Sequence, residues 1–159
     1  MLKPLEQFIC DKCKGVIEDP KLGYVEYLGE LSEPIGKMIQ IRSGFKIVHN
    51  SQEKSCYFYK RSVEQKTLPL SDFLNENKFS MIYSYLDEGA ILSPERVSVQ
   101  IKNIREFTDF ARRLCIPYYE EARCYFDQAI ADEFFDGANE FHVYSVQKMQ
   151  QIVEEYSDK

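Results

Sequence analysis

The sequence predicts an α+β fold in which a small β-rich N-terminal unit precedes a helical C-terminal part. Before about residue 65, apolar residues alternate or form short β-branched and aromatic runs, whereas after it they recur every three or four positions. With 44% hydrophobic and 14% aromatic residues, the 159-residue chain can bury a core. No Gly-, Ser- or Pro-rich linker divides it, so we expect two subdomains that pack together, residues 1–65 and 66–159.

Three short runs in the N-terminal part are typical of β-strands. Residues 23–28 (GYVEYL) alternate in polarity, and residues 37–42 (KMIQIR) and 45–49 (FKIVH) are rich in β-branched and aromatic side chains. The Ser43-Gly44 pair between the last two runs predicts a hairpin turn. The stretch GELSEPIGK, residues 29–37, connects the first run to the second and predicts a loop because of its Gly, Pro and Ser content.

Four apolar stripes at helical spacing follow in the C-terminal part, over residues 79–86, 93–114, 117–137 and 145–156. Gly89 and Gly137 are predicted helix ends, and Ser93-Pro94-Glu95 is a predicted helix start. Ser145 is a candidate N-cap of the last helix. Glu120 and Glu121 are predicted to form a charged first turn that suits the dipole of the third helix, on a solvated acidic surface. The pair Arg112-Arg113 is predicted to be solvated or salt-bridged.

The net charge of −6 is unevenly distributed between the two parts. Residues 1–62 carry ten Lys/Arg and eight Asp/Glu, whereas residues 63–159 carry ten Lys/Arg and eighteen Asp/Glu. An acidic C-terminal part disfavours a phosphate backbone as the default partner. No apolar run is long enough to span a bilayer, and the N-terminus lacks the pattern of a secretory signal, so we expect a cytoplasmic protein with no membrane partner.

The stretch FICDKCKG, residues 8–15, carries the most informative motif of the chain. Cys10 and Cys13 are separated by two residues, the spacing that lets two sulfur atoms face one metal ion. In a reducing compartment, spaced cysteines are metal ligands or redox groups more often than disulfide partners. The neighbouring cations Lys12 and Lys14 lower the cost of placing two thiolates side by side, and Gly15 tolerates a tight turn.

A second pair of ligand candidates lies beyond the predicted hairpin. His49 ends the run FKIVH, and Cys56 follows seven positions later across the polar segment NSQEKS. Cys10, Cys13, His49 and Cys56 together predict a Cys₃His site, for which Zn²⁺ is favoured over iron because the fourth group is an imidazole. The layout is similar to zinc-ribbon and treble-clef sites, although the second pair is spaced more widely. Four protein ligands leave no open position, so the predicted Zn²⁺ is structural.

Other interpretations of the cysteines remain open at this stage. Cys10 and Cys13 could form a redox pair, which favours a motif at a helix start within a βαβ unit, and no helical stripe follows here. His49 and Cys56 could be ordinary residues of a strand end and a packed loop. Cys115 and Cys124 are predicted to be buried apolar side chains, and a second site with His142 lacks a close ligand pair.

The sequence favours a non-enzymatic zinc-binding module that recruits a protein partner or forms a homodimer. It contains neither a phosphate-binding glycine loop nor a nucleophile elbow. One alternative is nucleic-acid binding by the N-terminal unit. Its cations would contact the backbone and the aromatic residues Tyr57, Phe58 and Tyr59 would stack on bases; the cations are Lys12, Lys14, Lys21, Lys37, Arg42, Lys46, Lys54, Lys60 and Arg61. A second alternative is a zinc hydrolase with an open coordination position and Glu53 as its nearest carboxylate.

Overall fold

The computed structural model describes residues 1–33, 36, 38–50, 56–59, 63–87, 91, 98–140 and 142–157. The predicted α+β class is confirmed, because a four-stranded sheet and a two-stranded one are combined with five α-helices in the described residues. No helix in this part of the chain has both the length and the apolar character needed to cross a bilayer.

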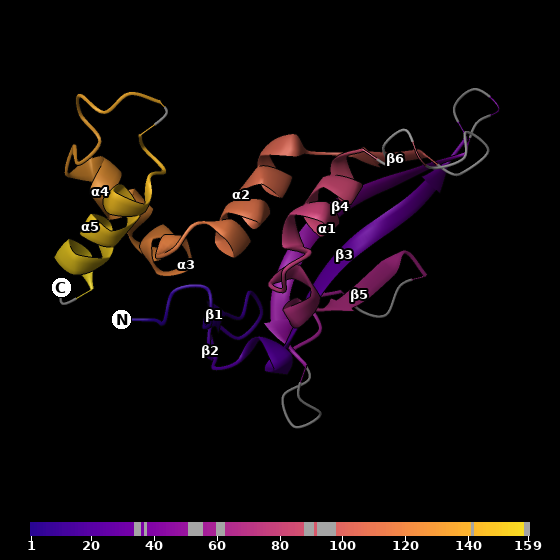
Figure 1. Cartoon of the computed structure of the whole chain (residues 1–159), viewed down its shortest axis with the longest axis horizontal. Helices are drawn as coiled ribbons and strands as arrows, with labels where there is room; N and C mark the ends of the chain where they lie inside the picture. Colours follow the sequence, from indigo (N-terminus) through magenta and orange to yellow (C-terminus); the bar gives the residue numbers. More distant parts are fainter. Residues whose placement is uncertain are drawn as a thin grey trace.

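The larger sheet has the strand order β5-β3-β4-β6 (Figure 1). β3 (Gly23–Ser32) and β4 (Ile39–His49) form a long antiparallel pair, β5 (Gln65–Pro69) lies antiparallel to β3, and β6 (Ser98–Ile101) runs parallel to β4. A smaller sheet pairs β1 (Phe8–Ile9) with β2 (Val16–Ile17). The predicted strand at residues 23–28 is therefore present, and it extends to Ser32 into the stretch predicted as a loop.

The predicted turn at Ser43-Gly44 is wrong, because β4 runs through it without a break. Glu26 pairs with Lys46 and Leu28 pairs with Ser43, so two residues of β4 oppose Tyr27 alone. Gly44 has a φ of +70° and supplies the left-handed backbone that such a β-bulge needs. The Ser-Gly pair thus marks a bulge within one strand, and the hairpin connects β3 to β4 instead.

Gly44→Ala is expected to destabilise the protein by about 2–3 kcal/mol, the sum of a left-handed alanine and a lost hydrogen bond. A Cβ atom at Gly44 would lie 2.0 Å from the hydroxyl oxygen of Tyr59, which donates a 2.6 Å hydrogen bond to the Gly44 carbonyl. Denaturant unfolding measures the change. Gly137→Ala is the control, because Gly137 has a φ of +75° with no atom within 4 Å. Equal losses in the two variants would show that Tyr59 does not restrict this position.

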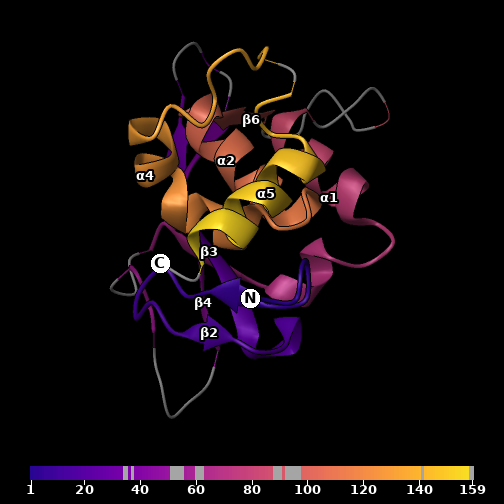
Figure 2. The ribbon, with the colours of Figure 1, turned by 90° about the vertical axis from the view of Figure 1, so that its left-hand side faces the viewer.

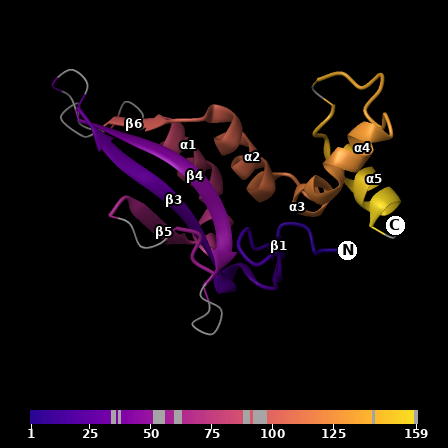
Figure 3. The same cartoon turned by 180° about the vertical axis from the view of Figure 1, so that it is seen from behind.

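Two helices pack against the larger sheet, α1 (Lys78–Leu86) and α2 (Ile104–Cys115) (Figures 1 and 3). The Phe45 ring of β4 stacks on Phe110 of α2 with centroids 5.0 Å apart, and it meets Tyr85 of α1 edge to face at 5.6 Å. The prediction for α1 is confirmed, whereas its predicted end at Gly89 and the helix start at 93–95 lie outside the described residues. Residues 98–101 are strand, so α2 begins only after its N-cap Asn103.

The predicted third helix is broken into short pieces. Tyr118 has a φ of +66° and precedes α3 (Tyr119–Ala122), a 3₁₀ turn covers residues 123–125, and α4 (Phe126–Ala131) follows. The last predicted helix is confirmed as α5 (Val146–Tyr156), and the Ser145 side chain accepts a hydrogen bond from the Lys148 amide. Figures 1 and 2 place α4 and α5 beyond the end of α2, at the same end of the molecule as the N-terminus.

The buried side chains form two clusters in the described part of the chain. One joins β1 and β2, the larger sheet, α1 and α2, and draws on residues from Phe8 to Leu114. The other joins α3, α4 and α5, from Tyr119 to Tyr156. Strands β5 and β6 lie after residue 65, yet they belong to the sheet that β3 and β4 begin. The division into residues 1–65 and 66–159 stays a prediction.

Candidate metal centre

The Cys10–Cys13 motif lies in a tight turn between β1 and β2, which gives it the form of a knuckle. The Cys10 amide donates to the Gly15 carbonyl at 2.9 Å, and the Lys14 amide donates to the Cys10 carbonyl at 2.9 Å. Lys14 has a φ of +63°, so the left-handed position of this turn falls on Lys14 rather than on Gly15. These bonds fix a backbone loop that presents both cysteine side chains on the same side of the chain.

The structure brings together all four side chains that the sequence analysis singled out. One ligand atom from each of Cys10, Cys13, His49 and Cys56 lies within 4.8 Å of every other. A zinc tetrahedron with bond lengths near 2.0–2.3 Å has edges of roughly 3.5–3.8 Å, so small side-chain shifts would close this group around an ion. Cys10 and Cys56 are buried, His49 is half-buried and Cys13 is exposed. The group therefore lies at the surface with its inner half covered by the core.

His49 is the last residue of β4, and its ring is oriented by a backbone carbonyl. Its Nε2 lies 3.1 Å from the Val16 oxygen, and its Nδ1 lies 3.4 Å from the Cys13 sulfur. A carbonyl oxygen can only accept a hydrogen bond, so Nε2 carries the proton and the Nδ1 lone pair faces the cysteines. Metal-binding histidines commonly donate their second N–H to such a carbonyl, which sets the tautomer.

Cys56 is held near the knuckle by a buried carboxylate of the sheet. The Glu26 side chain on β3 is fully buried, and its Oε2 accepts hydrogen bonds from the amides of Phe58 at 2.9 Å and Tyr59 at 3.3 Å. Tyr59 is tied in addition to Gly44 of β4. The segment 56–59 is thus fixed on two strands of the sheet, and Cys56 at its start faces Cys10 and Cys13.

The thiols of Cys10, Cys13 and Cys56 crowd one another. Burial raises the pKa of Cys56 to about 12, and hydrogen bonding to Cys13 together with the charge of Cys10 contributes in the same direction. Three sulfurs in one place cannot all become anionic without a compensating charge. A divalent ion supplies that charge and deprotonates its thiol ligands, so the donor set fits a metal that prefers thiolate and imidazole.

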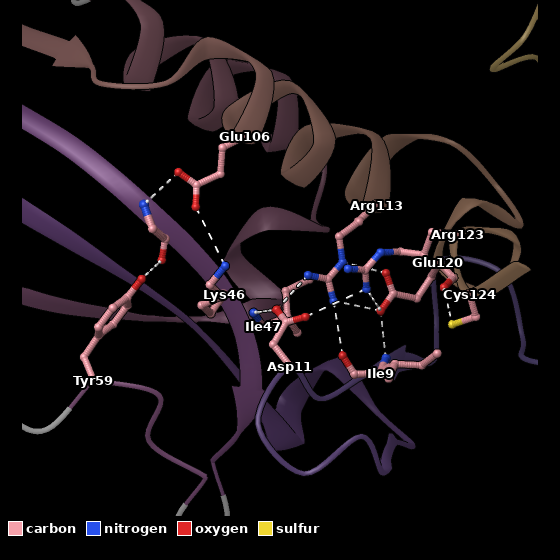
Figure 4. A network of polar contacts seen from close by, with 11 residues as sticks. Ile9, Asp11, Lys46, Ile47, Tyr59, Glu106, Arg113, Glu120, Arg123 and Cys124 are labelled. Atoms are coloured by element: carbon pink, nitrogen blue, oxygen red, sulfur yellow. Dashed lines mark hydrogen bonds and ion pairs between the residues drawn. The ribbon is translucent and has the colours of Figure 1, made fainter. Parts of the chain in front are cut away.

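A buried ion-pair network ties the knuckle to the helices (Figure 4). Arg113 of α2 donates to Asp11 at 2.7 Å and to both carboxylate oxygens of Glu120 at 2.6 and 2.8 Å. It also donates to the Ile9 carbonyl at 3.1 Å, and Glu120 accepts from the Ile9 amide at 2.8 Å. Asp11, which lies between the two knuckle cysteines, also accepts from the Ile47 amide at 2.7 Å.

The prediction that Glu120 and Glu121 lie on a solvated surface is wrong, and Arg113 takes the salt-bridged alternative. The exposed fractions of Arg113, Glu120 and Glu121 are only 3%, 5% and 8%. Burial lowers the pKa of the Arg113 guanidinium, but the charges and hydrogen bonds of Glu120 and Asp11 outweigh this and raise the pKa overall. A signal was present in the sequence, because Arg113 follows Phe110 by three positions and precedes Leu114, which places it on the apolar stripe of α2.

The remaining predictions about the cysteines have mixed outcomes. Cys115 is half-buried against the first core cluster, but Cys124 is exposed, so its predicted burial is wrong. Within the described residues, no other group of at least three His, Cys, Asp or Glu side chains has metal-binding geometry, so Cys115, Cys124 and His142 form no second site. The Cys10–Cys13 pair lies between strands rather than at a helix start, which does not favour the redox interpretation.

The surface beside the knuckle combines cations with an aromatic ring. The ammonium groups of Lys12 and Lys46 lie 5.7 and 5.3 Å from the Phe58 ring centroid. Lys46 also pairs with Glu106 at 3.7 Å, and Tyr59 is engaged with Gly44. Of the residues invoked for the other functions, Lys37, Lys54, Lys60, Arg61 and Glu53 lie outside the described residues. Nucleic-acid binding by this unit stays a prediction.

Comparisons with protein-family models, with curated proteins and with solved structures find no match to this chain.

Proposed function

We propose that this chain is a non-enzymatic zinc-binding module in which Cys10, Cys13, His49 and Cys56 hold one structural Zn²⁺. The N-terminal part then resembles a zinc ribbon or treble clef in that a knuckle between two short strands supplies the first ligand pair. Three thiolates and one imidazole complete a tetrahedral shell, so the ion has no position left for a reacting water. The proposed role of the metal is to join the knuckle to the end of the sheet.

The observation that carries this proposal is the convergence of four candidate ligands from three separate segments. Cys10 and Cys13 come from the β1–β2 turn, His49 from the end of β4, and Cys56 from the segment fixed by Glu26. The knuckle and β4 are also joined by two hydrogen bonds, from the Asp11 amide to the Ile47 carbonyl and from the Ile47 amide to the Asp11 carboxylate. A metal ion held by the four ligands would also link the knuckle to β4. The unfolded chain has no such preformed site, so binding of the ion would stabilise the folded state.

Metal content per chain tests the proposal on protein purified without added zinc. We expect one tightly held zinc per wild-type chain, and loss of it in Cys10→Ser, His49→Ala and Cys56→Ser. Cys115→Ser is the matched control, because Cys115 is a half-buried cysteine that belongs to the core and not to the cluster. Wild-type protein without metal, or equal retention by all the variants, would refute the zinc site.

We further propose that the zinc-stabilised unit serves a protein interaction in the cytoplasm, either with another protein or in a homodimer. Support comes from the large apolar side chains that the helices leave exposed, among them Phe79, Tyr83 and Leu86 of α1. Exposed apolar surface of this kind is what protein interfaces use as their centre.

A further inference from the structure

An apolar groove lies between α1 and α2, and none of the four candidate metal ligands lines it. It has a volume of about 300 Å³ and is lined by Phe79, Tyr83 and Leu86 of α1 and by Ala111, Cys115 and other residues of or near α2. Phe79 is 53% exposed and Tyr83 is 62% exposed, and their rings stack with centroids 6.5 Å apart. Large apolar side chains gathered along a hollow are characteristic of a docking surface.

The shape of the groove suits a helix. Phe79, Tyr83 and Leu86 follow one another at spacings of four and three residues, so they form one stripe along α1. The neighbouring wall is α2, which means that an incoming helix would lie between two existing ones. Helix-in-groove recognition uses apolar anchors at this same spacing on the incoming helix.

The charges around the groove select an acidic occupant. Arg112 lines the groove, and its guanidinium is held in place over the Tyr144 ring at 3.8 Å. The Lys78 ammonium lies 5.2 Å from the Phe79 ring centroid and also acts on the Cys115 thiol, whose pKa burial raises and Lys78 partly lowers. Among the described residues that line the groove, none carries a carboxylate. Two cations therefore flank an apolar floor within a part of the chain that is otherwise acidic.

A second copy of this chain fits the groove poorly. The long amphipathic helix α5 buries its apolar residues Met149, Ile152 and Val153 in the second core cluster, so it has no apolar face to offer. Two grooves placed face to face would bring the Arg112 and Lys78 charges of both copies together, which is repulsive. The occupant that meets both the shape and the charge is a helix from a different protein.

We propose that the α1–α2 groove binds an acidic amphipathic helix of a partner protein. This inference rests on the proposed interaction function and names its surface and the chemistry of its partner. The partner helix places apolar side chains against Phe79, Tyr83 and Leu86, while its carboxylates meet Arg112 and Lys78. The same two cations repel a basic helix.

Fluorescence anisotropy with two synthetic helical peptides tests this proposal. Both peptides carry leucines at three- and four-residue spacing, and the remaining positions are mainly Glu in one and mainly Lys in the other. We expect the Glu peptide to bind at least about tenfold more tightly than the Lys peptide, and Tyr83→Asp to weaken it by about tenfold or more. Ile130→Asp is the control, because Ile130 is also exposed but lies on α4 outside the groove. The double variant Lys78→Glu with Arg112→Glu should reverse the preference between the two peptides.

Three results would refute the proposed role of the groove: no binding of the Glu peptide, equal binding of both peptides, or a homodimer that dissociates in Tyr83→Asp. Zinc per chain is measured on the same preparations, so the two proposals fail separately. One zinc per chain without peptide binding removes the groove and leaves the zinc site. Peptide binding by a protein without zinc refutes the zinc site and supports the groove.

Discussion

Adding a zinc chelator is expected to lower the melting temperature of the protein by roughly 8–16 °C. An ion that binds only the folded chain stabilises it by about 4 kcal/mol when its free concentration is a thousand times the Kd. For a chain of this length, each kcal/mol corresponds to roughly 2–4 °C. Without the ion, the knuckle keeps its hydrogen bonds to Ile47 but loses the link from Cys10 and Cys13 to His49 and Cys56.

Thermal unfolding followed by circular dichroism measures this shift, with and without chelator. Cys10→Ser should melt at the temperature of the chelated wild type and should not respond to chelator, since it has no ion to lose. Cys115→Ser should respond like the wild type, because Cys115 lies in the core. A wild-type melting temperature that is insensitive to chelator would show that the ion, if bound, does not stabilise the fold.

The candidate site could be predicted from sequence because its residue types are rare in this chain and partly close together. With five cysteines and two histidines, the CxxC spacing and the strand end at His49 leave few possible ligand sets. The α5 helix could also be predicted from the sequence, because its N-cap Ser145 and its apolar stripe up to Tyr156 are local signals. The CxxC motif and the signals for α5 lie within about ten residues of the structure that they determine, whereas the grouping of Cys10 and Cys13 with His49 and Cys56 was inferred from residue type.

The errors arise where distant residues decide the local structure. Ser43-Gly44 suits a turn or a bulge, and the bulge forms because β3 continues to pair with β4 on both sides of Tyr27. β6 has only four residues, and its strand conformation depends on parallel pairing with β4, about 60 residues earlier. The position of Glu120 in a helix predicts a solvated carboxylate, whereas in the structure it is buried and binds Arg113 and the Ile9 amide.

The hydrogen-bonded position of Asp11 gives the network a role in the proposed metal centre. Asp11 is bonded at once to the Ile47 amide and to Arg113, and it lies between the two knuckle cysteines. The orientation of the knuckle therefore depends on a guanidinium that is 102 residues away in the sequence. Groups that orient metal ligands from outside the coordination shell commonly change metal affinity by about 10–100-fold when they are removed.

Arg113→Met is therefore expected to cost about 3–5 kcal/mol of folding free energy, because Asp11 and Glu120 lose their close, buried guanidinium and keep only the longer Arg123 contacts, at 3.8 and 3.9 Å. That corresponds to a melting temperature lower by roughly 6–20 °C. Zinc affinity, measured by competition with a chromophoric chelator, should fall by about tenfold or more. Arg105→Met is the matched control, since Arg105 is an exposed arginine of the same helix, and its effect should stay within about 0.5 kcal/mol.

A double-mutant cycle separates the ion pair from simple loss of packing. Glu120→Gln keeps the shape of the side chain, and combined with Arg113→Met it should cost about 0.5–3 kcal/mol less than the two single changes added together. Additive losses would mean that Arg113 and Glu120 act independently. A stable Arg113→Met protein with unchanged zinc affinity would show that the knuckle keeps its orientation through Ile47 alone. A loss of both stability and zinc affinity in Arg113→Met would show that Arg113 couples the helices and the proposed metal centre into one cooperative unit.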